Sequence, residues 1–212
     1  MIRWLAGALA ALVLAATAHA GPSRNEALAA LSAEDVEARR FGAAALLETG
    51  ILADAPALLR ALKDSDAEVR RLAEAAVWAV WSRSGDAAVD AILERGVVQM
   101  REGHVEASVD TFSEVIRRRP DFAEGWNKRA TAYYLLGEWR RSAADCDEVL
   151  RRNPQHFGAL SGYGMIWLEL DQPARALERF EQALTVNPNL DSVQRTIDAL
   201  RALLIKQRRE AI

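Results

Sequence analysis

The sequence predicts an all-α protein in which helical hairpins stack into a right-handed superhelix, an α-solenoid. Alanine and leucine are abundant and only 12 of the 212 residues are glycine, a composition that favours helices. Proline recurs at 34-residue intervals, at positions 120, 154 and 188, so a repeated unit ends near each of them. The net charge of −3 gives no overall attraction to phosphate, so the composition does not indicate nucleic-acid binding.

Residues 1–20 are expected to form a secretory signal peptide. Arg3 precedes an uncharged run, LAGALAALVLAA, that is too short to span a bilayer as a stable helix. Small residues then precede a possible cleavage site between Ala20 and Gly21. We therefore expect an exported protein with no stable membrane insertion after cleavage; an uncut N-terminal anchor is the alternative. The single cysteine, Cys146, excludes an internal disulfide and favours the bacterial periplasm as the destination.

Two similar stretches precede the proline-spaced units. The stretch at 33–47 resembles the stretch at 65–78, with Arg39 aligned to Arg70 at an offset of 31 residues. Between them, residues 53–64 are expected to form a short helix, because a proline lies near its start.

The shared pattern, Asp-x-x-Val-Arg-x-x-Ala-x-x-Ala, resembles short HEAT-like helical repeats, so residues 22–87 are interpreted as a HEAT-like segment. The resemblance implies that the early arginines contact acidic groups in the neighbouring turn, here Asp64 or Asp66. The linker at 82–87 is short, so we expect this segment and the following units to stack into one continuous superhelix.

The proline-spaced units align without gaps over residues 88–190, at 89–122, 123–156 and 157–190. Small residues share position 8 of the unit: Gly96, Ala130 and Gly164. Position 24 holds larger apolar residues in two units and a cysteine in the other: Phe112, Cys146 and Phe180. This alternation predicts two helices in each unit that approach closely at the small residues of position 8, while the larger residues of position 24 fill the space against the next unit.

This unit is similar to the tetratricopeptide repeat, a 34-residue helix–turn–helix. The proline at position 32 ends the second helix, since it lacks an N–H and clashes with the preceding turn. Gly103 and Gly137 suit the turn within the first two units, where a positive φ is often needed. The third unit departs from the pattern, because Asp171 takes this place and Pro173 starts the second helix.

Residues 191–212 are expected to form an amphipathic helix that caps the array. Four apolar residues recur at helical spacing on one face: Val193, Ile197, Leu200 and Leu204. The end repeat of a solenoid exposes an apolar side, which a further helix usually covers. A dimerisation helix is the alternative interpretation.

The sequence indicates no catalytic or metal chemistry. His104 and His156 fall near loops and are expected at the surface, and no further ligands stand at a metal-site spacing. Cys146 occupies a core column, so we expect a buried, unreactive thiol. The five tryptophans after residue 20 are interpreted first as packing residues, with an exposed partner anchor as the alternative for Trp81 and Trp139. We therefore predict a protein that is not an enzyme and needs no cofactor.

The resemblance to tetratricopeptide repeats implies that the first helix of each unit lines a concave groove for a partner peptide or helix. The candidate groove residues are Leu93, Val97, Met100, Arg101, Asn127, Thr131, Tyr134, Ser161, Met165 and Leu168. Some family members grip a chaperone's C-terminal carboxylate with a lysine and an asparagine. Leu93 and Val97 stand in those places here, so that specificity is not expected.

The function predicted from these observations is a monomeric, non-enzymatic scaffold or adaptor that binds protein partners in the bacterial cell envelope. Two alternatives stay open. The first is an accessory subunit of an envelope enzyme, or a weak enzyme with a site where the two arrays meet. The second is a module that assembles with itself through its C-terminal helix.

Overall fold

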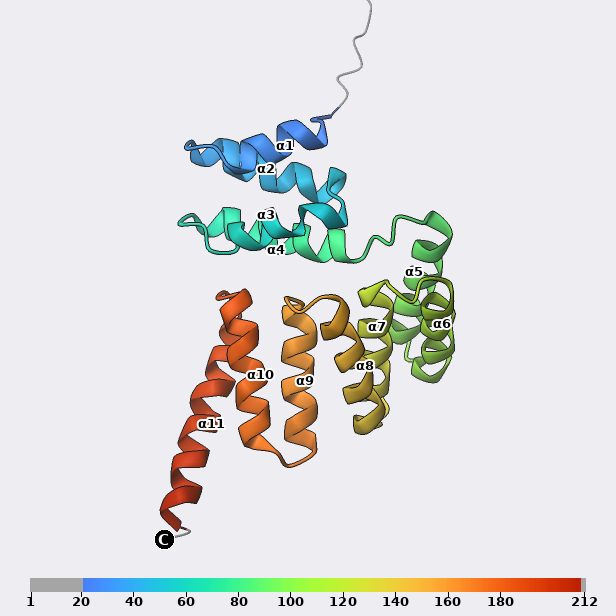
Figure 1. Ribbon diagram of the computed structural model, residues 1–212, viewed down its shortest axis with the longest axis vertical. Helices are drawn as coiled ribbons and strands as arrows, with labels where there is room; N and C mark the ends of the chain where they lie inside the picture. The colour runs from blue at the N-terminus through green and yellow to red at the C-terminus, as the bar shows by residue number, and fades with distance from the viewer. Residues whose placement is uncertain (1–20, 211–212) are drawn as a thin grey trace, which may run out of the picture.

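The computed structural model describes residues 21–210, so the expected signal peptide lies outside the described residues. Within that range every regular element is a helix, which confirms the all-α class and the α-solenoid (Figure 1). The elements are α1 (Arg24–Leu31), α2 (Val36–Thr49), η1 (Leu52–Asp54), α3 (Ala55–Ala61), α4 (Ala67–Trp81), α5 (Ala87–Arg101), α6 (Val105–Arg118), α7 (Ala123–Leu135), α8 (Trp139–Arg152), α9 (Phe157–Glu169), α10 (Pro173–Val186) and α11 (Asp191–Glu210).

The repeat array consists of the hairpins α5–α6, α7–α8 and α9–α10, followed by α11. The second helix of each hairpin ends two residues before the recurring proline, at Arg118, Arg152 and Val186. Proline disfavours helical backbone at the residue before it, so the period of the prolines sets the period of the hairpins.

Close packing within a hairpin depends on the glycine at position 8. A Cβ atom added at Gly96 would lie 2.4 Å from the Phe112 ring, and one added at Gly164 would lie 2.6 Å from the Phe180 ring. Both rings are buried, so each phenylalanine fills the space that its glycine leaves open. The small and large residues alternate as the sequence predicts, but each phenylalanine packs against the glycine of its own hairpin, whereas we expected it to pack against the next unit.

The turns within the hairpins need a left-handed residue. Gly103 and Gly137 have φ values of 84° and 73°, and Asp171 has φ 54° at the same place in the third hairpin. Aspartate tolerates this region better than most residues, because its short side chain can hydrogen-bond to nearby backbone. Pro173 then occupies the first position of α10, where its missing N–H costs nothing.

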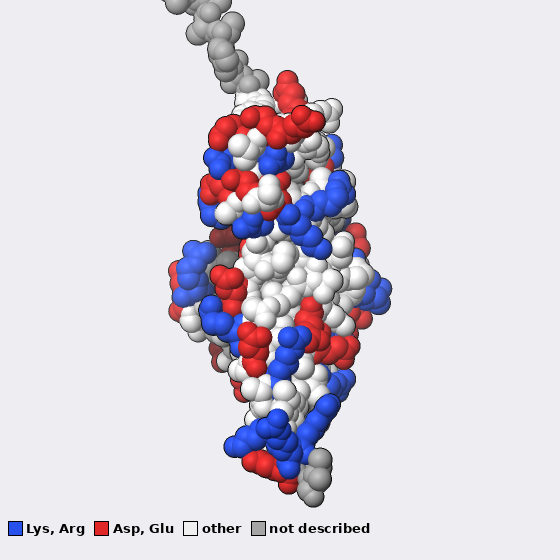
Figure 2. All heavy atoms as spheres, turned by 90° about the vertical axis from the view of Figure 1, so that its left-hand side faces the viewer, with Lys and Arg blue, Asp and Glu red and all other residues white. Residues whose placement is uncertain are grey.

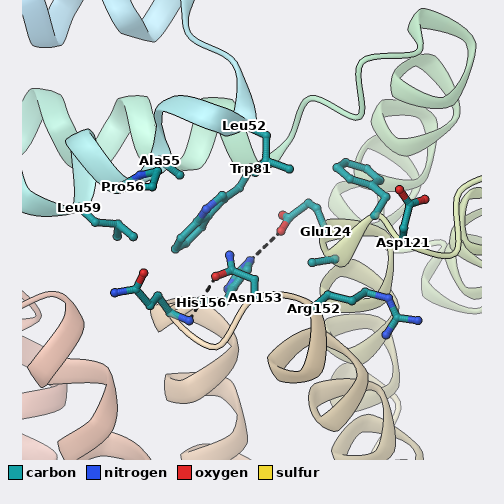
Figure 3. A pocket seen from close by; sticks show the side chains of 13 residues that line it. Leu52, Ala55, Pro56, Leu59, Trp81, Asp121, Glu124, Arg152, Asn153 and His156 are labelled. Atoms are coloured by element: carbon teal, nitrogen blue, oxygen red, sulfur yellow. Dashed lines mark hydrogen bonds and ion pairs between the residues drawn. The ribbon is translucent and has the colours of Figure 1, made fainter. Parts of the chain in front are cut away.

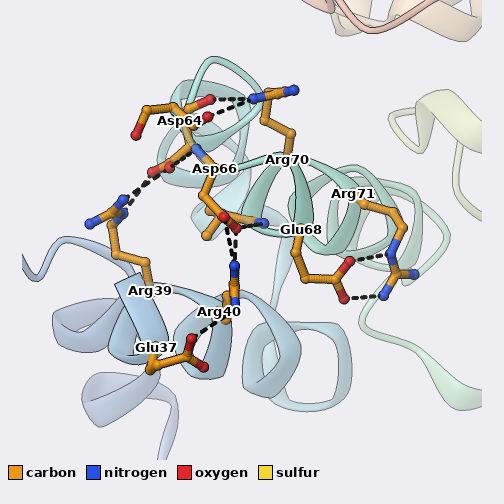
Figure 4. Close-up of polar contacts among 10 residues, drawn as sticks. Glu37, Arg39, Arg40, Asp64, Asp66, Glu68, Arg70 and Arg71 are labelled. Carbon is orange, nitrogen blue, oxygen red and sulfur yellow. Dashed lines mark hydrogen bonds and ion pairs between the residues drawn. The ribbon is translucent and has the colours of Figure 1, made fainter. Parts of the chain in front are cut away.

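Helices α1–α4 form a second helical layer that ion pairs hold together (Figure 4). Arg39 donates two hydrogen bonds to Asp64, and Arg40 donates two to Asp66. Asp66 also accepts a hydrogen bond from the Val69 N–H and so caps α4. The contact between arginine and the acidic turn is therefore present as expected, whereas the HEAT-like assignment itself stays a prediction.

The N-terminal layer does not continue the stack of the repeats, contrary to our expectation. Helix α4 does not pack along α5; instead the layer lies across the ends of the repeat helices (Figure 1). The linker turns sharply, with Gly85 at φ 80° and the Ser84 N–H bonded to Asp90. Trp78 then packs against Phe157 at the start of α9, because this contact buries both rings.

Helix α11 packs on α10 and covers the apolar end of the array through Val193, Ile197 and Leu200. Its last turns extend past this contact and leave Leu203 and Ile205 exposed. The face in Figure 2 carries charges of both signs over the N-terminal layer, an uncharged middle and a basic tip. None of the helices within residues 21–210 is long and apolar enough to span a membrane.

Candidate protein-interaction sites

A hollow of about 90 Å³ opens between α7 and α9, the first helices of the second and third repeats. Four of the ten candidate groove residues line it: Asn127, Thr131, Tyr134 and Met165. Of the remaining candidates on α9, Ser161 donates a hydrogen bond to its own helix at the Phe157 carbonyl, and Leu168 packs against the core of the third repeat. We call this hollow and its rim the α7–α9 groove.

The α7–α9 groove exists because the middle repeat carries a small residue in a core column. Cys146 takes the place that phenylalanine fills in the other two repeats, and it faces Ala130 across the hairpin. Gly162 on α9 adds no side chain, and a Cβ atom there would meet nothing within 4 Å. Burial raises the pKa of the Cys146 thiol to about 12, so it is neutral at physiological pH. The expected buried, unreactive thiol is confirmed.

Polar side chains on α7 rim this groove. The Tyr134 hydroxyl donates a hydrogen bond to Glu169 at 3.2 Å, and its ring packs 5.1 Å from Trp139. Thr131 donates to the Asn127 carbonyl within its own helix. The Asn127 amide donates to Glu124 at 3.1 Å, so this side chain is fixed by a buried carboxylate. The rim is therefore held in place by the protein's own contacts.

The first repeat contributes little to the groove. Leu93 is buried in the core of that repeat, and Val97 and Met100 pack against the same cluster. Arg101 is exposed at the end of α5. None of these four candidates lines the hollow between α7 and α9.

A buried pair that the sequence analysis missed lies where the N-terminal layer meets the repeats (Figure 3). His156, expected at the surface, is fully buried, and its Nε2 lies 3.0 Å from Glu124 Oε2. His156 Nδ1 accepts the Ala159 N–H at the start of α9, so the proton of the neutral ring belongs to Nε2, which donates to Glu124. Lys128 Nζ lies 3.0 Å from the other carboxylate oxygen.

The Glu124 carboxylate stays charged despite its burial. Burial alone would raise its pKa, but the His156 hydrogen bond and the Lys128 charge together hold the pKa below its ordinary value. Because the Glu124 carboxylate on α7 is bonded to His156 at the start of α9 and paired with Lys128, the cluster fixes the second repeat to the third.

Trp81 completes this cluster, in agreement with the packing role that the sequence analysis takes as the default. Its ring stacks on His156 with centroids 4.3 Å apart, and only 3% of the residue is exposed. The neighbouring Trp78 lies so close to α9 that a Cβ atom at Gly158 would come within 2.2 Å of it. Gly158, one of three glycines in α9, was the sequence signal for this docking. Trp139, the other tryptophan for which exposure was the alternative, packs half-buried against Tyr134.

Among residues 21–210, no group of three or more His, Cys, Asp and Glu side chains is arranged to hold a metal ion. The expected exposure of His104 is correct: its side chain lies in the open beside Glu102.

The hairpin geometry, the packing of small against large residues and the proline-ended second helices define a helical-repeat protein of the α-solenoid class. A family model described as tetratricopeptide repeat matches residues 93–157 and 128–191. This match agrees with the resemblance to tetratricopeptide repeats that the sequence predicts, and residues 21–92 lie outside it.

Curated relatives share this repeat region. A TPR repeat-containing protein of Rhizobium etli is 32% identical over 128 residues, which cover 60% of this chain and 63% of that protein. Tetratricopeptide repeat protein 12 of Homo sapiens is 26% identical over 110 residues, covering 52% of this chain and 16% of that protein. The chain therefore spans less than two thirds of the length of either relative.

Solved structures share the fold. The Sgt2 TPR domain from Aspergillus fumigatus superposes with a TM-score of 0.56 at 19% identity, covering 60% of this chain and 85% of that one. The first TPR of Spaghetti (RPAP3), bound to an HSP90 peptide, gives a TM-score of 0.54 at 20% identity, covering 55% and 93%. At this level of identity, the similarity shows a common fold alone.

Proposed function

We propose that the protein is a non-enzymatic scaffold or adaptor of the bacterial cell envelope that holds a segment of a partner protein in the α7–α9 groove. The observation that carries the proposal is the hollow itself, because a large apolar side chain that lines it stands exposed. This side chain is Met165, which is 40% exposed. Exposed apolar groups around a preformed hollow are typical of a docking surface, and methionine adapts to different partner side chains.

Structural neighbours support peptide binding by this fold. RPAP3 was solved with an HSP90 peptide, and the TPR2B domain of yeast Sti1, with a TM-score of 0.52, was solved in a complex with pHsp70. The specificity here is proposed to differ from that of a carboxylate clamp. Leu93 occupies one clamp position and is buried in the core of the first repeat.

The envelope location rests on the sequence of residues 1–20, with its single arginine, its short apolar run and its small residues before Gly21. Expression in a bacterium, followed by separation of periplasm from cytoplasm and mass measurement, tests it. We expect a periplasmic product that begins at Gly21. A cytoplasmic product of full mass would reject this part of the proposal.

The groove is tested by crosslinking in the native envelope followed by quantitative mass spectrometry. Met165→Arg and Thr131→Arg place a long cation in the hollow and should remove the crosslinked partner without changing the helical circular-dichroism signal. Phe41→Arg is the matched control, because Phe41 is also an exposed apolar residue but lies on α2. Partner capture that is unchanged in both groove variants would reject the groove as the binding site.

A second candidate function is self-assembly through α11, favoured by its exposed Leu203 and Ile205. Light scattering separates the two. If α11 assembles copies of the chain, Leu203→Lys combined with Ile205→Lys converts an oligomer to a monomer; if it only caps the array, the mass stays that of a monomer throughout.

A further inference from the structure

A second groove follows the boundary between the N-terminal layer and the repeat array. Three hollows of about 440, 240 and 360 Å³ adjoin one another along this boundary. The first and second hollows share Leu52, Asp121 and Phe122; the second and third share Pro56, Leu59 and Gln155. Because each hollow shares lining residues with the next, we treat them as one channel and call it the seam groove.

One wall of the seam groove comes from η1 and α3, and the other comes from the loops between repeats (Figure 3). The loops that follow α6 and α8 reach the same edge of the array, because each repeat returns the chain to the same place after 34 residues. Trp81 and the His156–Glu124 pair lie at the base of the central hollow. The seam groove thus forms where the loops between repeats meet the N-terminal layer, which does not share the 34-residue period.

The centre of the seam groove is apolar and partly open to solvent. Leu52, on η1, is 54% exposed, and Pro56 is also exposed; Leu59 and Phe122 lie deeper in the walls. An exposed leucine beside buried apolar walls presents surface that a partner's apolar side chain can cover favourably.

Charge distinguishes the two ends of the seam groove. At the end of α3, Arg60 and Lys63 are exposed, and neither side chain has an ion pair or hydrogen bond with any residue in 21–210. At the other end, Arg83 donates hydrogen bonds to the carbonyls of Gly50 and Leu47. Arg119 forms an ion pair with Asp121 in the same loop. The available positive charge therefore stands at the α3 end.

The walls of this groove are fixed to each other. The Asn189 amide donates to the Leu62 carbonyl at 2.8 Å, and Arg70 donates to Asn189 Oδ1 at 2.8 Å. These bonds join the turn after α3 to the turn after α10. A groove held open by the protein's own contacts binds a segment without first ordering its walls, which favours affinity.

We propose that the seam groove binds an extended segment of a partner protein that has apolar side chains followed by acidic residues. The apolar side chains cover Leu52, Pro56 and Phe122, and the acidic residues pair with Arg60 and Lys63. Alternate side chains of an extended chain on one face are about 7 Å apart, so a segment of six or seven residues supplies one side chain to each hollow. This site is independent of the α7–α9 groove.

The probe is an array of fluorescent synthetic heptapeptides of the form Φ-Ser-Φ-Ser-Φ-Asp-Glu, where Φ is Leu, Ile, Val or Phe, and the same peptides in reverse order. A matched array ends in Lys-Lys. Fluorescence anisotropy with the full mature chain should show saturable binding of acidic peptides and at least tenfold weaker binding of their basic counterparts. Absence of saturable binding, or equal binding of both arrays, overturns the proposal.

Variants locate the bound peptide. Arg60→Glu combined with Lys63→Glu should weaken the binding of the acidic peptides at least tenfold. Leu52→Ser should weaken the binding of these peptides in both the forward and the reversed sequence. Arg208→Glu combined with Arg209→Glu makes the same charge change at the basic tip of α11 and should leave binding unchanged (Figure 2). All of these positions are exposed, so circular dichroism should show intact folding.

Met165→Arg separates the two grooves. It blocks the α7–α9 groove and should not alter peptide affinity. If Met165→Arg abolishes binding and the Arg60 and Lys63 variant does not, the peptides occupy the α7–α9 groove, which overturns the seam-groove proposal and leaves the proposed function standing.

Discussion

The N-terminal layer and the repeat array reach stability in different ways. In the array, the first and third hairpins each pack a phenylalanine into the space left by a glycine of the same hairpin, so these contacts lie about 16 residues apart and recur with the repeat. The N-terminal layer packs an apolar core of its own and adds arginine–aspartate pairs and tryptophans that dock against a repeat far along the chain. Contacts that recur with the repeat can therefore be predicted from a single sequence, whereas the docking of two unlike regions cannot.

The largest effect is expected from emptying a core column of the array. Phe112→Ala removes a fully buried ring and should lower the free energy of unfolding by about 3–5 kcal/mol in urea titration. Cys146→Ala, in the same column of the middle repeat, removes one small group and should cost about 1 kcal/mol. Equal losses of unfolding free energy at the two positions would contradict the conclusion that position 24 of the middle repeat fills less of the core.

Docking of the N-terminal layer should respond separately. Trp81→Ala removes the ring that stacks on His156, and we expect a destabilisation of about 3 kcal/mol, concentrated at the boundary. Hydrogen exchange should accelerate in α1–α4 while α6 and α10 keep their protection. Phe41→Ala, on the exposed side of α2, is the control and should leave exchange unchanged. Uniform acceleration across the chain would mean that the layer and the array unfold as one unit.

The Glu124 carboxylate makes this boundary sensitive to acid. Its pKa is lower in the folded protein than the ordinary value of 4.5, so its contribution is complete above about pH 4.5 and is lost as the pH falls through the folded pKa. Thermal unfolding of the wild type should therefore weaken more steeply between about pH 5 and pH 3 than that of Glu124→Gln. Parallel pH profiles of the two proteins would exclude Glu124 as a source of the acid sensitivity.

The smallest effect is expected from an exposed ion pair in the N-terminal layer. Arg71 pairs with Glu68 on the surface of α4, where water and salt screen the attraction (Figure 4). Arg71→Ala should leave the unfolding midpoint unchanged, whereas Arg39→Ala breaks the half-buried pair with Asp64 and should lower it. If Arg71→Ala lowered the unfolding midpoint as much as Arg39→Ala, the exposure of an ion pair would not determine its contribution to stability.

The repeat fold could be predicted because three prolines and two columns of residues share one period. The α7–α9 groove was predicted in part: Asn127, Thr131, Tyr134 and Met165 meet there, since family geometry places them on neighbouring helices. Leu93 was misplaced because the first repeat buries that position in its own core.

The boundary between the layers could not be predicted from local pattern. His156 follows Pro154 in a loop-like stretch, which is typical of an exposed position, yet a tryptophan 75 residues earlier covers it. No spacing rule links the two residues, because the contact depends on how the linker after α4 turns. Two features of the sequence indicated that another element packs on this edge of the repeat array. They are Gly158 and the carboxylate of Glu124 at the start of a packed helix.

The hydrogen bond from Asn189 to the Leu62 carbonyl joins positions 127 residues apart, near opposite ends of the described chain. During synthesis, the N-terminal helices emerge first, but they cannot form this hydrogen bond until the third repeat has also been synthesised. A chain cut short before that point keeps its early helices without their final anchorage, so the bond ties correct docking of the beginning to completion of the end.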